Sequence, residues 1–197
     1  MHVDRTLKLA IVSLLFNMVY SAYHIIFGIT TRSWWLFTIG IYYTILSVVR
    51  FAVLRHRGNR RFVIRFTGIM LMVLSISLVG TVILAFVKDR DTVFHLIVML
   101  TIAIYAFTKI TLATIKWIKA RKSKSVKLIT LRNISFADAF VSIFSLQRSM
   151  LVSFEGMSEI EIRIMNLATG SAVCIIVFLL GLNLVRQSKS IKRKQQR

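Results

Sequence analysis

Six long apolar stretches limit what this chain can fold into. They cover residues 7–29, 34–54, 63–87, 93–118, 128–151 and 164–185. At about 1.5 Å of rise per residue, each stretch would make a helix long enough to cross a hydrocarbon core roughly 30 Å thick. Lipid offers the backbone no hydrogen-bond partners, so spanning segments must satisfy their own amides and carbonyls. The sequence therefore predicts an all-α fold, a polytopic membrane protein with a six-transmembrane-helix bundle.

The composition and the lone cysteine exclude several other classes. The chain is 56% hydrophobic, and its charged residues cluster between the apolar stretches, whereas soluble domains are about 45–50% apolar. The first stretch is too long for a signal peptide, so we expect it to remain in the mature protein. Cys174 is the single cysteine and falls inside the last stretch, which excludes a disulfide framework or a thiolate metal cluster. We expect no cofactor.

The net charge of +20 is distributed unevenly along the chain. Basic residues gather before the first stretch, in the second and fourth turns, and after the last stretch, whereas the other turns are nearly neutral. The positive-inside rule then predicts that the N- and C-termini are cytoplasmic. We expect a transmembrane domain over residues 1–185, a basic cytoplasmic tail over 186–197, and a location in the cell (cytoplasmic) membrane. The expected partners are the lipid bilayer and anionic head groups at its cytoplasmic face, with a homodimer left open and no nucleic acid.

The fifth stretch carries a polar stripe that organises the rest of the chain. The polar residues follow one another at steps of three and four, a spacing that places them on one face of a helix. They are Ser135, Asp138, Ser142, Ser145 and Ser149. A carboxylate at bilayer depth costs roughly 2.5–3.5 kcal/mol, so this face should point toward protein or water. Two interpretations follow. The stripe is either a seam of small residues between closely packed helices, or a polar path or ion site.

Lys109 is a second charge inside an apolar stretch, and its depth matches that of Asp138. The turn between the fourth and fifth stretches centres near Ser123, about equally far from both residues. In an antiparallel hairpin they would reach the same level, so we predict an ion pair between them. Arg132 should point away from the Asp138 stripe. Arg50, about one turn from the end of the second stretch, should snorkel to the cytoplasmic surface.

A second polar stripe lies in the first stretch, where Ser13, Asn17, Tyr20 and His24 follow at steps of four, three and four. The favoured interpretation is hydrogen bonding between helices through Asn17, with Tyr20 and His24 at the outer membrane interface. The alternative is a histidine that titrates near neutral pH. Tyr42 and Tyr43 bring further hydroxyls to the second stretch.

Two short motifs resemble a known family. The turn from Gly28 to Ser33 is similar to the G-x-x-x-x-S with which cation diffusion facilitator (cation efflux) transporters enter their second helix. Asp138 and Ser142, preceded by residues 125–130, resemble the D-x-x-x-S of that family's fifth helix. The resemblance implies six membrane helices with both ends inside, and transport across the bilayer. Residues 33–51 also resemble uncharacterised small membrane proteins of Gram-positive bacteria, a likeness that implies no activity.

The family's metal site has no counterpart in this sequence. The resemblance implies ligands on the second helix at Tyr42 and Leu46, and a partner of Asp138 at Ile134, and none of these three side chains is a usual Zn²⁺ ligand. One remaining oxygen ligand cannot hold Zn²⁺, so we predict no metal site.

Two classes of function follow from the sequence. The first is a transporter with a cation-efflux-like scaffold that has lost the usual divalent-metal site. The second is a non-transporting membrane scaffold that binds anionic lipid or a partner protein. We expect no enzyme, because we find no nucleophile paired with a base.

Overall fold

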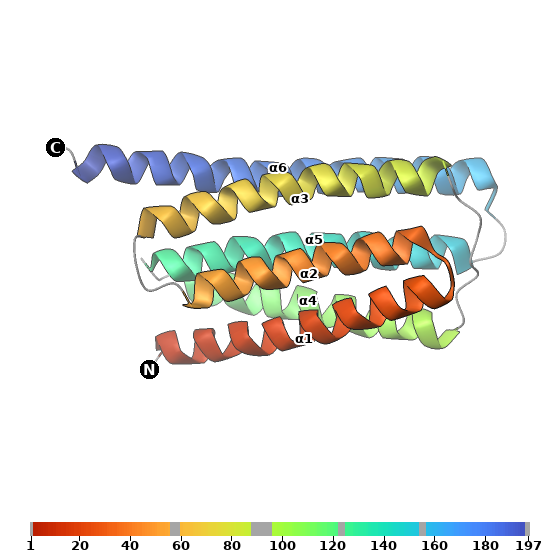
Figure 1. Ribbon diagram of the computed structural model, residues 1–197, viewed down its shortest axis with the longest axis horizontal. Helices are drawn as coiled ribbons and strands as arrows, with labels where there is room; N and C mark the ends of the chain where they lie inside the picture. Colours follow the sequence, from red (N-terminus) through yellow and green to blue (C-terminus); the bar gives the residue numbers. More distant parts are fainter. Residues whose placement is uncertain (1, 56–59, 88–95, 122–124, 154–156, 196–197) are drawn as a thin grey trace.

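The computed structural model describes residues 2–55, 60–87, 96–121, 125–153 and 157–195. These residues form six helices (Figure 1): α1 (His2–Thr30), α2 (Trp34–Arg55), α3 (Arg60–Val87), α4 (Leu96–Arg121), α5 (Val126–Ser153) and α6 (Glu159–Gln195). Each of the six is long and apolar enough to cross a membrane. The predicted all-helical fold and the number of apolar helices are therefore confirmed for the described part of the chain.

The helices form a bundle with α5 at its centre. Helices α1 and α2, α3 and α6, and α4 and α5 make the closest pairs, and α5 also contacts α2, α3 and α6. In Figure 1, α3 and α6 lie along one side, α1 and α4 along the other, and both chain ends lie at the same end of the bundle. The apolar span of α5 is 72% buried, against 56% or less for every other span. The helix with the serine and aspartate stripe is thus the one that the others surround.

Local hydrogen bonds account for the tight turn between α1 and α2. The Ser33 amide donates to the Gly28 carbonyl at 2.9 Å, and the Arg32 amide donates to the Ile29 carbonyl at 3.2 Å. This is the Schellman pattern that ends many helices, with Arg32 in the left-handed conformation at φ 53°. A Cβ atom on Gly28 would lie 2.6 Å from the Phe37 amide nitrogen. Glycine therefore stands where α2 approaches α1 most closely.

Helix α6 is longer at both ends than the apolar stretch from which it was predicted. It begins at Glu159 because Ser158 and Glu161 form a capping box: the Ser158 amide donates to Glu161 Oε2 at 2.9 Å, and the Glu161 amide donates to Ser158 Oγ at 3.4 Å. The helix continues past residue 185 to Gln195, and buried Ser188 donates to the Arg61 carbonyl of α3 at 3.3 Å. Residues 186–195 of the predicted basic tail thus continue α6 as a helix, and the division of the chain at residue 185 stays a prediction.

Candidate functional site

Asp138 lies at the centre of a buried polar cluster built from four helices. Its Oδ2 atom accepts hydrogen bonds from Lys109 Nζ of α4 at 2.8 Å, Arg50 Nη2 of α2 at 3.0 Å and Asn17 Nδ2 of α1 at 3.2 Å. All four side chains are at most 2% exposed. The predicted ion pair between Lys109 and Asp138 is present, and Arg50 adds a second cation on the same oxygen atom. We call these four residues the Asp138 cluster.

The expectation that Arg50 snorkels to the surface was wrong. Its side chain is fully buried, with Nη1 donating to Ser13 Oγ and Nη2 donating to Asp138. A guanidinium group inside a bundle is stabilised by a carboxylate and a hydroxyl within reach, which makes the inward direction favourable. The sequence held a signal for this arrangement, because Arg50 shares a helix face with Tyr43 and Ser47.

Tyrosines and serines extend the cluster on one side. The Tyr105 hydroxyl donates to Asn17 Oδ1 at 3.0 Å, and the Lys109 ammonium lies 4.9 Å from the Tyr105 ring centroid. Ser142 Oγ donates to the Asp138 carbonyl at 2.8 Å. Because that bond uses its only proton, Ser142 must accept from the Tyr43 hydroxyl at 2.9 Å. Tyr43 thus connects α2 to the serine stripe of α5, and Tyr105 connects α4 to Asn17 of α1.

Tyr20 and His24 are buried between helices, and their level at the outer interface of the membrane stays a prediction. Tyr20 is 5% exposed and stacks on Tyr105, while His24 is 0% exposed and its Nδ1 lies 3.2 Å from the Tyr20 carbonyl. Hydrogen bonding between helices through Asn17 is confirmed. Packing between α1, α2 and α4 buries the aromatic part of this stripe, because the Tyr20 ring contacts both Tyr43 and Tyr105.

Several buried polar atoms in this region have no hydrogen-bond partner among the described residues. They are Tyr20 Oη, Tyr42 Oη, His24 Nε2, Arg50 Nε, Asp138 Oδ1 and Ser145 Oγ. Each such atom costs about 1–3 kcal/mol when it is left unsatisfied away from water. Unpaired buried atoms of this kind are the groups that an internal water or a polar ligand would contact.

The serine stripe of α5 faces the interior along its whole length. Ser135, Ser142, Ser145 and Ser149 are all at most 4% exposed. Ser135 Oγ accepts from Lys116 Nζ of α4 at 3.0 Å. Lys116 lies near the end of the fourth apolar stretch, and it is only 2% exposed. Sequence reasoning missed this residue, although it lies seven positions after Lys109 and so on nearly the same face of α4.

The buried charges around Asp138 do not balance. Among the described residues, Asp138 is the only buried carboxylate, whereas Arg50, Lys109 and Lys116 are three buried basic side chains close to it. Basic side chains therefore outnumber carboxylates around Asp138 in the described part of the chain.

A divalent metal does not suit this arrangement. In the described part of the chain, no three His, Cys, Asp or Glu side chains come together. Tyr42, Leu46 and Ile134 are all buried, but they bring no carboxylate or imidazole to Asp138. Asp138 Oδ2 accepts hydrogen bonds from the Arg50 guanidinium and the Lys109 ammonium, and these positive charges would repel a divalent cation at the same carboxylate. His95 and Glu155 lie outside the described residues.

Comparison with known proteins adds no assignment. Neither known protein families nor curated proteins match this chain. The site is therefore interpreted from its own geometry and charge.

Proposed function

We propose that this chain is a multi-pass protein of the cell (cytoplasmic) membrane, with both termini in the cytoplasm. The charged groups of the Asp138 cluster lie inside the bundle, while large apolar side chains cover its outside, among them Val19, Ile76 and Ile97, which are 71%, 68% and 76% exposed. A water-soluble protein rarely exposes so much contiguous apolar surface. Both chain ends lie at the same end of the bundle as the end of α2 and the end of α4. Basic residues gather in the sequence at these helix ends, and this supports the orientation.

Reporter fusions test this insertion and orientation. A reporter fused after Arg197 is expected to give a cytoplasmic signal, and one inserted at Gly156 an external signal. The reverse result at either position contradicts the topology, whatever the protein transports or binds.

Within this membrane protein, the Asp138 cluster serves as the binding centre of a transporter for a small anion. The observation that carries this proposal is that, within the described part of the chain, one buried carboxylate is paired with Arg50 and Lys109 and has a third buried basic side chain, Lys116, near it. An isolated cation in a low-dielectric interior is costly, and a bound anion would offset that cost. Lys116 has a hydroxyl and no carboxylate as its hydrogen-bond partner among the described residues. It is the first candidate for contact with a solute.

Asp138 acts as an internal counter-ion in this proposal. When no solute is bound, its carboxylate holds Arg50 and Lys109 at 3.0 and 2.8 Å. An incoming phosphate, halide or small carboxylate competes with Asp138 for the same donors, since guanidinium and ammonium groups bind all three. A ligand changes the equilibrium between two conformations only if it interacts with them differently. A solute that replaces Asp138 as the partner of these donors would provide such a difference between the solute-free and the solute-bound conformation. The proposal includes no metal and no catalysed reaction.

The cation-efflux resemblance remains a prediction about the scaffold alone. Helix number and the two short motifs support it, whereas the charge at the centre favours an anion over a divalent cation. Calorimetry offers a separate check. Stoichiometric micromolar binding of Zn²⁺ that is lost in Asp138→Ala would contradict the proposed absence of a metal site.

Uptake of labelled anions into proteoliposomes tests the transport proposal. Phosphate, chloride and a monocarboxylate are supplied separately, with pH and membrane potential clamped. At least one is expected to enter faster than into protein-free vesicles, and Lys116→Met should slow its uptake several-fold. Lys189→Met, an exposed position on α6, is the matched control and should leave uptake unchanged. If no anion enters faster than into protein-free vesicles, the anion proposal fails.

One observation favours the second function, a membrane scaffold that binds anionic lipid or a partner protein. The Asp138 cluster joins α1, α2, α4 and α5 through a single carboxylate oxygen. Such an arrangement could serve only to hold the four helices together. In that case Lys116→Met would change stability without changing the uptake of any anion.

A further inference from the structure

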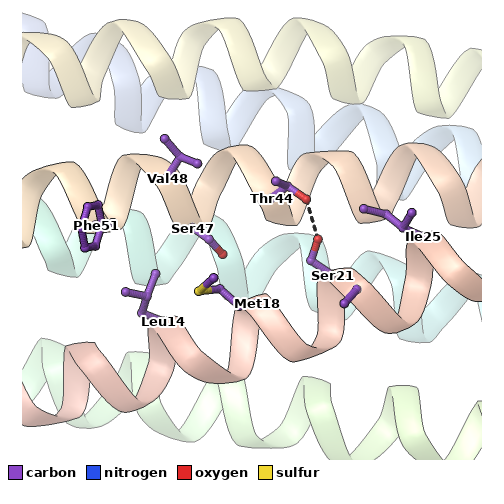
Figure 2. Close-up of a pocket in the computed structure, with 9 residues that line it drawn as sticks. Leu14, Met18, Ser21, Ile25, Thr44, Ser47, Val48 and Phe51 are labelled. Atoms are coloured by element: carbon purple, nitrogen blue, oxygen red, sulfur yellow. Dashed lines mark hydrogen bonds between the residues drawn. The ribbon is translucent and has the colours of Figure 1, made fainter.

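A groove lies between α1 and α2 (Figure 2), where the lining side chains of Met18, Val48 and Phe51 are 55%, 60% and 50% exposed. Its volume is about 520 Å³, within the range of pockets that hold small ligands. Side chains from both helices line it, and the apolar ones are Leu14, Met18, Ala22, Ile25, Val48 and Phe51. We call this feature the α1–α2 groove.

The three hydroxyl groups that line the groove already have partners inside the protein. Ser21 Oγ donates to the Gly40 carbonyl at 2.8 Å and lies 2.6 Å from Thr44 Oγ1 (Figure 2). Ser47 Oγ donates to the Tyr43 carbonyl at 2.8 Å. The walls therefore present methyl and methylene groups with satisfied hydroxyls, a lining that suits a hydrocarbon chain better than a polar ligand.

Two features indicate which hydrocarbon ligand would fit the groove: its length, and the charge of the residue at its expected cytoplasmic end. From Leu14 to Ile25 the groove follows eleven residue steps of α1, about 16 Å, close to half of a hydrocarbon core roughly 30 Å thick. On α2 the groove residues Thr44, Val48 and Phe51 are followed on the same face by exposed Arg55, one turn beyond Phe51. The Arg55 guanidinium group thus lies at the level expected for the head group of a lipid whose acyl chain fills the groove.

We propose that the α1–α2 groove binds one acyl chain of an anionic phospholipid of the cytoplasmic leaflet, with its phosphate paired to Arg55. The proposal rests on the proposed membrane insertion and orientation, but not on transport. Groove and head-group contacts should contribute separately, because apolar burial retains any phospholipid, whereas Arg55 distinguishes an anionic head group from a zwitterionic one.

Native mass spectrometry of the detergent-solubilised full chain tests both contacts. The protein is incubated with phosphatidylglycerol or phosphatidylcholine of identical acyl chains, and the retained lipid is counted. The wild-type chain is expected to retain one phosphatidylglycerol several-fold more often than one phosphatidylcholine. Ala22→Trp fills the groove and should lower retention of both lipids several-fold. Arg55→Gln should remove the preference for phosphatidylglycerol and keep the basal retention.

Matched variants keep the result interpretable. Ala168→Trp and Arg186→Gln change exposed positions on α6 and should behave as wild type. The proposal fails if Ala22→Trp retains as much lipid as Ala168→Trp. It also fails if the wild-type chain is dimeric by mass and Ala22→Trp makes it monomeric, since a second copy would then occupy the groove. Reversed topology reporters would refute the orientation, and a negative uptake assay would leave this binding result standing.

Discussion

The α3–α6 pair and the Asp138 cluster hold helices together by different means. Where α3 crosses α6, the carbonyl oxygens of Gly68 and Gly181 leave no room for a side chain on the opposite glycine, because an added Cβ atom would lie 2.8 or 2.7 Å away. Aliphatic side chains continue the contact, among them Leu71, Leu184 and Val177, each fully buried. Close backbone approach and dispersion are enough for association in lipid.

The Asp138 cluster joins its helices through charges that a packed interface does not need. Replacing a buried ion pair with well-packed apolar residues is often neutral or stabilising, and the α3–α6 pair shows that this chain can build a tight apolar contact. The comparison therefore suggests that Arg50, Lys109 and Asp138 have a role other than packing. Four predictions follow in order of expected effect, three within the two regions and one outside them.

The largest effect is expected from Asp138→Leu, which leaves Arg50 and Lys109 buried without their carboxylate. The free energy of unfolding in mixed detergent micelles should fall by about 3–5 kcal/mol. Adding Lys109→Met alone should recover little, because Arg50 remains unpaired. Adding Arg50→Met as well should recover most of the loss. A loss below about 1 kcal/mol for Asp138→Leu would mean that water solvates Arg50 and Lys109 in place of the carboxylate. The cluster would then not differ from the α3–α6 pair in how strongly it depends on charge.

Gly68→Ala should destabilise the apolar pair by about 1–3 kcal/mol, since its Cβ atom would lie 2.8 Å from the Gly181 carbonyl oxygen and force the backbones apart. The same unfolding titration measures it. Gly80→Ala is the control on the same helix, because no described atom lies within 4 Å of its added Cβ. That variant should gain up to about 1 kcal/mol from helix propensity. Equal effects at both glycines would contradict the close approach.

Within the polar region, the two tyrosine hydroxyls should differ. Tyr105→Phe leaves the carbonyl oxygen of Asn17 without its donor and should cost about 1.5 kcal/mol of unfolding free energy. Tyr43→Phe removes one acceptor interaction of Ser142, whose own proton still reaches the Asp138 carbonyl, and should cost about 0.5–1 kcal/mol. The reverse order in thermal or chemical unfolding would overturn the assigned directions of these bonds.

The smallest effect is expected outside both regions, at the turn between α1 and α2. Arg32→Gly places the residue best suited to a left-handed conformation at φ 53°. It should raise the free energy of unfolding by up to about 1 kcal/mol. Ser33→Gly has no such benefit and serves as the comparison. A loss of stability in Arg32→Gly would show that the arginine side chain contributes more than its backbone conformation costs.

The sequence by itself determined the six apolar helices, the inward face of α5 and the match in depth between Lys109 and Asp138. The period of the polar residues fixes a helix face locally. The constant rise of a helix and a short turn fix which levels of neighbouring helices meet. Both rules act within one or two adjacent helices, which is why the predicted ion pair is present. The function drawn from these features, and the family resemblance, stay predictions.

Only the tertiary structure decided which other residues join Asp138. Arg50 and Asp138 are 88 positions apart, and periodicity does not determine whether α2 or another helix lies beside α5. The burial of His24, the inward turn of Lys116 and the meeting of Gly68 with Gly181 depend on the same choice of neighbours. A lysine or arginine near a helix end can reach water or a buried partner with similar ease. Its direction is decided only when packing brings a carboxylate or a hydroxyl within hydrogen-bonding distance.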